Sequence, residues 1–99
     1  MQREAVERTR RVHELKTHPS YFRAALAGLK PFEVRKNDRD YCAGDVLRLV
    51  EWDPAREAPF QNTGRAMLVL VTYVLPGGRF GIDPAYCVMG IQPNGDTHG

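Results

Sequence analysis

One helical segment near the start of the chain, followed only by strand-like segments, is the feature that most restricts the fold. Thr17 or His18 fits the cap position of a helix, and Pro19 fits its first position. Over residues 21–27 apolar side chains recur at helical spacing, and Gly28 follows where a left-handed C-terminal cap belongs. Because no helical pattern follows, the alternating order of strands and helices that builds a doubly wound parallel sheet is excluded.

The remaining segments either alternate apolar and polar residues or form β-branched runs, which predicts strands. They are Val12–Lys16, Phe32–Lys36, Asp45–Trp52, Ala66–Leu75, the brief Phe80–Ile82 and Tyr86–Gln92. A sheet with so little helix must close on itself or fold over to cover its second face. We therefore expect a mainly β (α+β) fold with one or two helices: a small β-barrel of five to six mostly antiparallel strands, with a helix at one end.

Length and composition indicate one globular domain. The chain has 99 residues, of which 42% are hydrophobic and 26% charged. No apolar run approaches the ~18 residues of a membrane span. We expect no signal peptide, because residues 1–11 are charged and contain no apolar stretch. Cys42 and Cys87 stand alone, without the paired spacing of a zinc site. A disulfide between them stays open, but we expect reduced thiols in a cytoplasmic protein.

Positive charge is concentrated in the first half of the chain. Residues 1–48 contain eleven Lys and Arg against seven Asp and Glu, whereas residues 49–99 contain three against five. Any anionic partner is therefore expected at the first half. We divide the chain into a basic arm (1–11), a domain (12–92) and a tail (93–99). The arm is either a solubilising segment or an extra contact to phosphates.

The most informative stretch follows the predicted helix and has the pattern GxKxxExR, from Gly28 to Arg35. Lys30 lies in the turn, and Glu33 and Arg35 share one face of the next strand because they are two residues apart. Two cations beside one carboxylate suit a phosphate or a polar heterocycle. The alternative is a surface ion-pair cluster without function. The same alternation predicts that Phe32 and Val34 face the core.

With these residues, the chain resembles the ASCH domain, whose fold is related to PUA. The run HELKTHPSYFRAALAGLKPFEVRKNDRDYCAGDVLRLVEWDP and the later VTYVLPGGRFGIDPAYCVMGI resemble the ASCH-like family DUF3850 of bacteria and phages. The resemblance covers roughly residues 13–91. It implies a PUA-like barrel that binds RNA or a nucleotide, with Lys30, Glu33 and Arg35 in a cleft beside the barrel.

The resemblance also draws attention to residues specific to this family, which are His13, Lys16, Asn37, Asp38 and Arg39. We include His13, Lys16 and Arg39 among the candidate ligand-binding residues, although a single histidine is more often structural. Asn37 and Asp38 are typical of a turn. His18 is assigned to the helix start, and His98 lies in the tail.

Aromatic side chains are a second set of candidates, because single-stranded bases stack on aromatic rings. Five were considered: Tyr21, Tyr41, Trp52, Phe60 and Phe80. Most are expected in the core of so small a domain. We single out Trp52 as a ligand contact, since it precedes a loop predicted over residues 53–64.

Two other classes of function stay open. One ASCH branch hydrolyses N4-acetylcytidine, which would make Lys30 and Glu33 catalytic, although Glu33 replaces that branch's threonine and its distant glutamate is missing here. Metal-independent cleavage of RNA, with His13 added, is a variant of this hydrolase hypothesis. The other class is a protein-interaction module or phage accessory factor. We expect no cofactor, no resident metal and a monomer or weak dimer.

Overall fold

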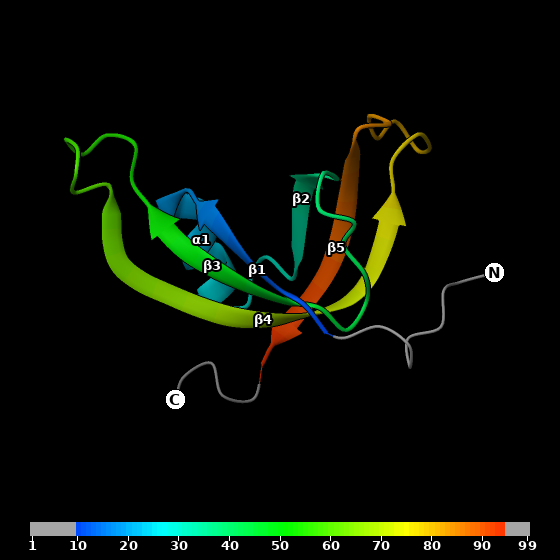
Figure 1. The fold of residues 1–99 in the computed structure, drawn as a ribbon, viewed down its shortest axis with the longest axis horizontal. Helices are drawn as coiled ribbons and strands as arrows, with labels where there is room; N and C mark the ends of the chain where they lie inside the picture. Colours follow the sequence, from blue (N-terminus) through cyan, green and yellow to red (C-terminus); the bar gives the residue numbers. More distant parts are fainter. Residues whose placement is uncertain (1–9, 95–99) are drawn as a thin grey trace.

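The computed structural model describes residues 10–94, which form a curled five-stranded sheet with one helix inside its curve (Figure 1). The elements are β1 (Val12–Thr17), α1 (Pro19–Leu26), β2 (Phe32–Lys36), β3 (Val46–Trp52), β4 (Asn62–Pro76) and β5 (Tyr86–Pro93). The predicted fold class is confirmed: mainly β, with one helix and five strands. Most of the predicted arm and tail, with Arg3, Arg8 and His98, lies outside the described residues. Within those residues, α1 is far too short to cross a membrane.

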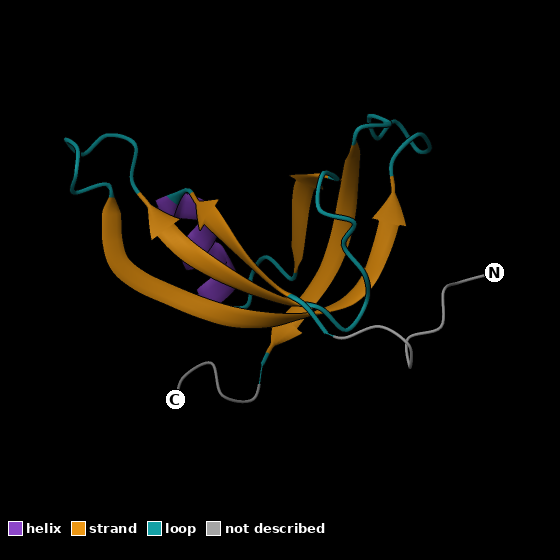
Figure 2. Ribbon diagram, viewed as in Figure 1, coloured by secondary structure: helices purple, strands orange, loops and turns teal. Residues whose placement is uncertain are grey.

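The strand order is β1-β3-β4-β5-β2. β1 runs parallel to β3, for example with Leu15 opposite Leu49, and every other neighbouring pair is antiparallel. β1 and β2 are therefore the two edges of the sheet, and within residues 10–94 they do not pair with each other. The sheet curls into a half-barrel whose two ends rise toward the same side (Figure 2). We call the gap between the β1 and β2 edges the seam.

The structure departs most from the sequence prediction at the start of β4 and at the short strand predicted before β5. β4 begins at Asn62, so the loop before it covers residues 53–61. The predicted strand at Phe80–Ile82 is wrong, because these residues close a turn in which Ile82 N donates to Arg79 O at 2.9 Å. Phe80 has a φ of 55°, in the left-handed region, which ends any extended run.

The core lies between the inner face of the sheet and one face of α1. Phe22 and Ala25 of α1 pack on buried residues of every strand except β2. The expectation that most aromatic side chains are buried is wrong. Of the nine, only Phe22 and Tyr41 are buried, Trp52 is half-buried, and the other six are exposed. The core is therefore built chiefly from aliphatic and sulfur-containing side chains.

The face of β2 that turns inward is the opposite of the predicted one. Glu33 is 2% exposed, whereas Phe32 and Val34 are 42% and 51% exposed. The alternation itself was predicted correctly, since Glu33 and Arg35 do share one face. β2 is an edge strand, and its inner face meets charged and hydroxyl groups of neighbouring elements rather than the aliphatic core. The Glu33 carboxylate finds its ion-pair partners on the inner side, and this decided which face of β2 turned inward.

A second buried carboxylate, Glu51 in β3, provides a pH-dependent prediction. Its Oε1 accepts hydrogen bonds from Arg65 Nε at 3.0 Å and Thr63 Oγ1 at 2.6 Å. The bond from Arg65, and after it that from Thr63, lowers the pKa of Glu51. A carboxyl whose pKa is lower in the folded state stabilises the fold above its unfolded pKa, and this contribution is lost as the pH falls through the folded pKa.

We therefore expect Glu51→Gln to flatten the acid side of the stability profile. The measurement is the free energy of urea unfolding over a series of buffers from neutral to acid pH. The wild-type protein should lose stability more steeply than the variant in the acid range. Parallel profiles for the two proteins would contradict the assignment.

Candidate ligand-binding site

Glu33 is a buried carboxylate held between two cations. Lys30 Nζ lies 2.6 Å from its Oε2, and Arg35 Nε lies 3.0 Å from its Oε1. The Glu33 side chain is 3% exposed, and those of Lys30 and Arg35 are 17% and 23% exposed. Burial of a carboxylate is costly unless it is paired and hydrogen-bonded, and both conditions are met here. The GxKxxExR motif therefore forms a single charged unit with a net positive charge.

Local sequence explains how Lys30 reaches this position. After the helix, Gly28 N donates to Ala25 O and Leu29 N donates to Ala24 O, the two hydrogen bonds of a Schellman cap. Gly28 has a φ of +79°, as the cap requires, so the glycine predicted to end the helix does so. Lys30 N also donates to Ala24 O at 3.2 Å, which ties the backbone of Lys30 to the helix end.

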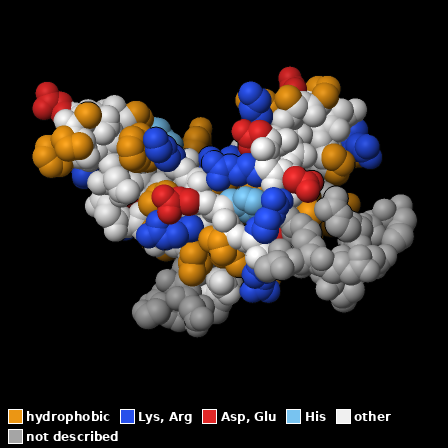
Figure 3. Space-filling view, in the orientation of Figure 1, with side chains coloured by type: hydrophobic (Ala, Val, Ile, Leu, Met, Phe, Trp, Pro, Cys, Tyr) orange, Lys and Arg blue, Asp and Glu red, His pale blue; other side chains and the backbone are white. Residues whose placement is uncertain are grey.

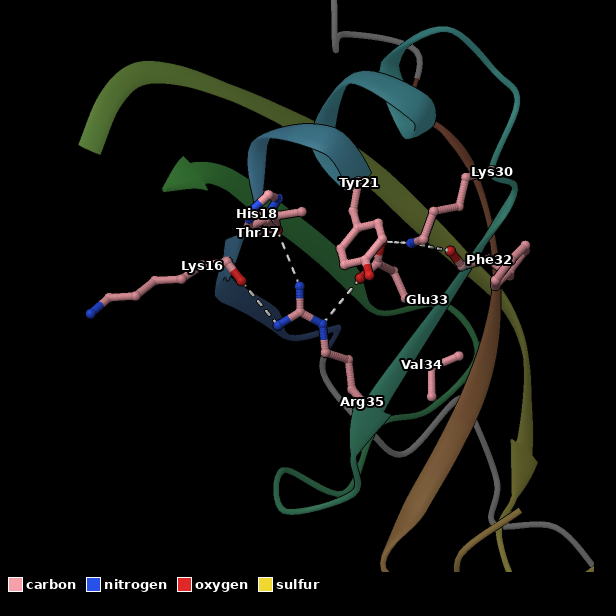
Figure 4. Close-up of a pocket in the computed structure, with 9 residues that line it drawn as sticks. All are labelled: Lys16, Thr17, His18, Tyr21, Lys30, Phe32, Glu33, Val34 and Arg35. Atoms are coloured by element: carbon pink, nitrogen blue, oxygen red, sulfur yellow. Dashed lines mark hydrogen bonds and ion pairs between the residues drawn. The ribbon is translucent and has the colours of Figure 1, made fainter. Parts of the chain in front are cut away.

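Arg35 also spans the seam. Its Nη1 donates to Lys16 O at 3.1 Å, and its Nη2 donates to Thr17 Oγ1 at 3.1 Å (Figure 4). Both acceptors belong to β1, the opposite edge of the sheet. The planar guanidinium thus links β1, β2 and Glu33, using three separate nitrogens in a fixed geometry.

Beside this unit lies an open hollow of about 590 Å³. Its lining residues are Lys16, Thr17, His18, Tyr21, Lys30, Phe32, Glu33, Val34 and Arg35. Lys and Arg side chains gather on the concave face between the raised ends of the sheet (Figure 3). A site of this size suits a small polar molecule or one nucleotide of a longer chain.

Two exposed aromatic rings flank the Lys30 ammonium. Its Nζ lies 5.7 Å from the centre of the Tyr21 ring and 5.2 Å from that of the Phe32 ring. Tyr21 is 58% exposed, so its ring is available to a ligand. A flat ring beside paired cations is the combination that stacks a base and attracts its phosphate.

The structure brings together four of the seven predicted ligand-binding residues: Lys16, Lys30, Glu33 and Arg35. The Lys16 side chain turns away from the hollow, and its Nζ lies 4.0 Å from the centre of the Trp52 ring. Trp52 itself does not line the hollow. It forms, with Lys16, a cation–aromatic contact on the side of β1 that faces β3.

His13 and Arg39 lie further along the seam. His13 is 7% exposed, and its Nε2 lies 3.0 Å from Oδ2 of the fully buried Asp45. Its ring packs edge-on against Tyr41 at 4.8 Å. Arg39 Nη1 donates to Glu14 O at 3.1 Å, on the same open edge of β1 that Arg35 contacts. The candidate residues therefore lie along the seam in two groups, a separation that the sequence did not predict.

The sequence did not point to Thr17, although the alternation of β1 places it on the face of His13 and Leu15. The hydroxyl of Thr17 orients Arg35, a role that only the curl of the sheet reveals. His18 was assigned to the helix start, and its Nδ1 does accept from Ser20 N at 3.2 Å. Its place on the wall of the hollow follows from the position of α1.

Burial explains the pKa shifts of two other titratable groups near the site. Burial raises the pKa of Tyr41, and the charges of Arg39 and Arg35 partly oppose that effect. Burial likewise raises the pKa of the Cys87 thiol. Within residues 10–94, no group of three His, Cys, Asp or Glu side chains is close enough to hold a metal ion. Cys42 and Cys87 are free thiols.

These features define a class of protein: a small half-barrel domain with a cation-lined hollow between its helix and an edge strand. Residues 12–91 match the family described as "Domain of unknown function (DUF3850)". The chain belongs to this family. It is also similar to the "Uncharacterized 12.9 kDa protein in GpA 3'region" of Escherichia phage P2, with 50% identity over 42 residues. That match covers 42% of this chain and 38% of the phage protein.

Proposed function

We propose that this domain is an RNA- or nucleotide-binding module of the ASCH, PUA-like type, acting in the cytoplasm without a cofactor. The observation that carries the proposal is the Lys30–Glu33–Arg35 unit at the wall of an open hollow, with the exposed Tyr21 ring beside it. Anionic ligands are favoured by the excess of cations. Planar ligands are favoured by the aromatic rim.

The roles of the groups follow from their contacts. Tyr21 stacks on a base, and Lys30 neutralises a nearby phosphate while it stays paired with Glu33. Each carboxylate oxygen of Glu33 accepts one hydrogen bond, from Lys30 or from Arg35, and has a second lone pair. That lone pair suits a hydrogen bond from the exocyclic amino group of a base. Arg35 is held by three hydrogen bonds, so it acts chiefly as a fixed positive charge.

The Tyr21→Ala variant tests the proposal without disturbing the core. Stacking of one base on an aromatic ring contributes about 1–3 kcal/mol, so affinity for single-stranded RNA should fall by roughly 5- to 100-fold. The measurement is fluorescence anisotropy of labelled single-stranded RNA at low and moderate salt. Affinity should also decline with salt, because binding releases counterions from the phosphates.

Tyr73→Ala is the matched control. Tyr73 is 65% exposed, like Tyr21, but it lies on β4 and does not line the hollow. Its loss should leave affinity unchanged. Failure of the wild-type protein to bind either RNA or mononucleotides at low salt would refute the proposed function. Equal losses in the two tyrosine variants would place the ligand elsewhere.

A second candidate function is hydrolysis of a modified nucleoside, with Lys30 and Glu33 as the catalytic pair. The direct 2.6 Å contact between Lys30 Nζ and Glu33 Oε2 favours it, because general acid–base catalysis needs a proton donor and a proton acceptor held beside the substrate. Glu33→Gln separates the two functions. Turnover would be abolished in a hydrolase, whereas a binding module would change only its choice of ligand.

A further inference from the structure

His13 is held through one ring nitrogen. Asp45 Oδ2 lies 3.0 Å from His13 Nε2, and the same oxygen accepts from Cys42 N at 3.0 Å. Asp45 is 0% exposed, and Arg11 N donates to its other oxygen at 3.4 Å. A carboxylate fixed in this way is an acceptor, so Nε2 carries the proton. The neutral imidazole then has its lone pair on Nδ1.

Nδ1 is the reactive atom that remains. Within residues 10–94, each side-chain nitrogen or oxygen atom that is buried away from solvent has a hydrogen-bond partner. The hydrogen bond of the His13 side chain runs through Nε2, so Nδ1 meets solvent. His13 shares the face of β1 with Thr17, whose hydroxyl accepts from Arg35 across the seam. Nδ1 is therefore a base on the seam side of the sheet.

Two arginines bind the backbone of β1, the strand that carries this base. Arg39 donates to the carbonyl of Glu14, the residue after His13, and Arg35 donates to that of Lys16. Both charges also act on the phenol of Tyr41, whose ring packs on the imidazole. A base next to two cations is the arrangement that removes a proton from a hydroxyl and stabilises the extra negative charge that develops on an adjacent phosphate.

We propose that His13 is the general base of a metal-independent ribonuclease site, oriented by Asp45. The inference rests on the proposed binding of RNA in the neighbouring hollow. His13 Nδ1 takes the proton of a ribose 2′-hydroxyl, and the 2′-oxygen attacks the adjacent phosphorus. The bond from phosphorus to the 5′-oxygen breaks, and water gives that oxygen a proton. The products are a 2′,3′-cyclic phosphate and a 5′-hydroxyl, and His13 returns its proton to solvent.

The groups in direct contact with the His13 ring are Asp45 and Tyr41. The Arg11 backbone faces Asp45, and its guanidinium donates to Arg39 O.

The test incubates the full chain with end-labelled single-stranded RNA in excess EDTA and follows fragment length on a gel. Cleavage is expected, with cyclic phosphate ends. His13→Gln should slow it by about 100-fold or more, the usual contribution of a positioned general base. Asp45→Asn should slow it too, since an amide no longer fixes the tautomer. Arg79→Ala, a change at an exposed arginine outside the site, should leave the rate unchanged.

A second substrate keeps the test valid if the His13 variant does not fold. Wild-type protein should bind RNA with 2′-O-methyl groups and leave it intact, because the nucleophile is blocked. Binding of ordinary RNA without shortening would overturn the ribonuclease inference and leave the proposed function standing. Absence of binding would refute both. Cleavage that EDTA abolishes, or that persists in a folded His13→Gln variant, would also overturn the inference.

Discussion

The Arg35→Ala variant should lose about 3 kcal/mol or more of unfolding free energy, because it leaves the buried Glu33 carboxylate with one cation instead of two. It also removes the hydrogen bonds that Arg35 makes to Lys16 O and Thr17 Oγ1, which link the two edges of the sheet. A loss of this size should lower the Tm by more than about 10 °C in a domain of this length. Urea unfolding and thermal unfolding both measure it.

Two further variants show whether the effect arises from the buried charge. Arg48 pairs with Glu14 at 2.9 Å, but both side chains are well exposed, so Arg48→Ala should cost under about 1 kcal/mol. The double change Glu33→Leu with Arg35→Met removes the charge and its partner together. It should cost less than Arg35→Ala alone, since Lys30 can extend to solvent. A double variant less stable than the single one would contradict this explanation.

Phe22→Ala should destabilise the fold by about 3–5 kcal/mol, the cost of emptying a large buried site. Phe22 is 1% exposed and anchors α1 in the curve of the sheet. The helix presents Tyr21 to the hollow and sets the position of Lys30 through its C-terminal cap. Looser docking of α1 should therefore weaken ligand binding as well as stability.

Leu26→Ala is the control on the same helix. Leu26 is 50% exposed, and its loss should change the stability by well under 1 kcal/mol, as for most surface substitutions. Amide hydrogen exchange adds a local measurement, with protection across α1 falling in the Phe22 variant and not in the Leu26 variant. Equal stability of the two variants would show that α1 contributes little to the core.

The two proposals make separate demands on the seam. Binding depends on the hollow at Tyr21 and Lys30, whereas cleavage depends on the pair His13 and Asp45 further along β1. Arg35 lies between these groups, because it contacts Glu33 on one side and influences Tyr41 on the other. An RNA strand lying along the seam would place a base in the hollow and a neighbouring ribose near His13. This arrangement predicts that RNA should be held more tightly than a mononucleotide.

Local signals in the sequence determined the elements and the make-up of the charged unit. Gly28 was assigned as the helix cap because only glycine accepts a left-handed backbone at little cost, and its φ of +79° confirms this. The spacing of Glu33 and Arg35 placed them on one face of a strand, since side chains alternate with a period of two. These features depend on near neighbours in the chain, so the sequence alone was sufficient for them.

Only the tertiary structure decided which face of β2 turned inward, and how the seam divided. Alternation leaves the two faces equivalent, and the hydrophobicity of Phe32 and Val34 favoured the wrong one. Glu33 turned in because β2 is an edge strand on which Lys30 and Arg35 pair with its carboxylate. Likewise, Asp45 lies 32 residues from His13, and their contact depends on the parallel pairing of β1 with β3. Such long-range pairings are set by packing across the whole sheet, which no local pattern contains.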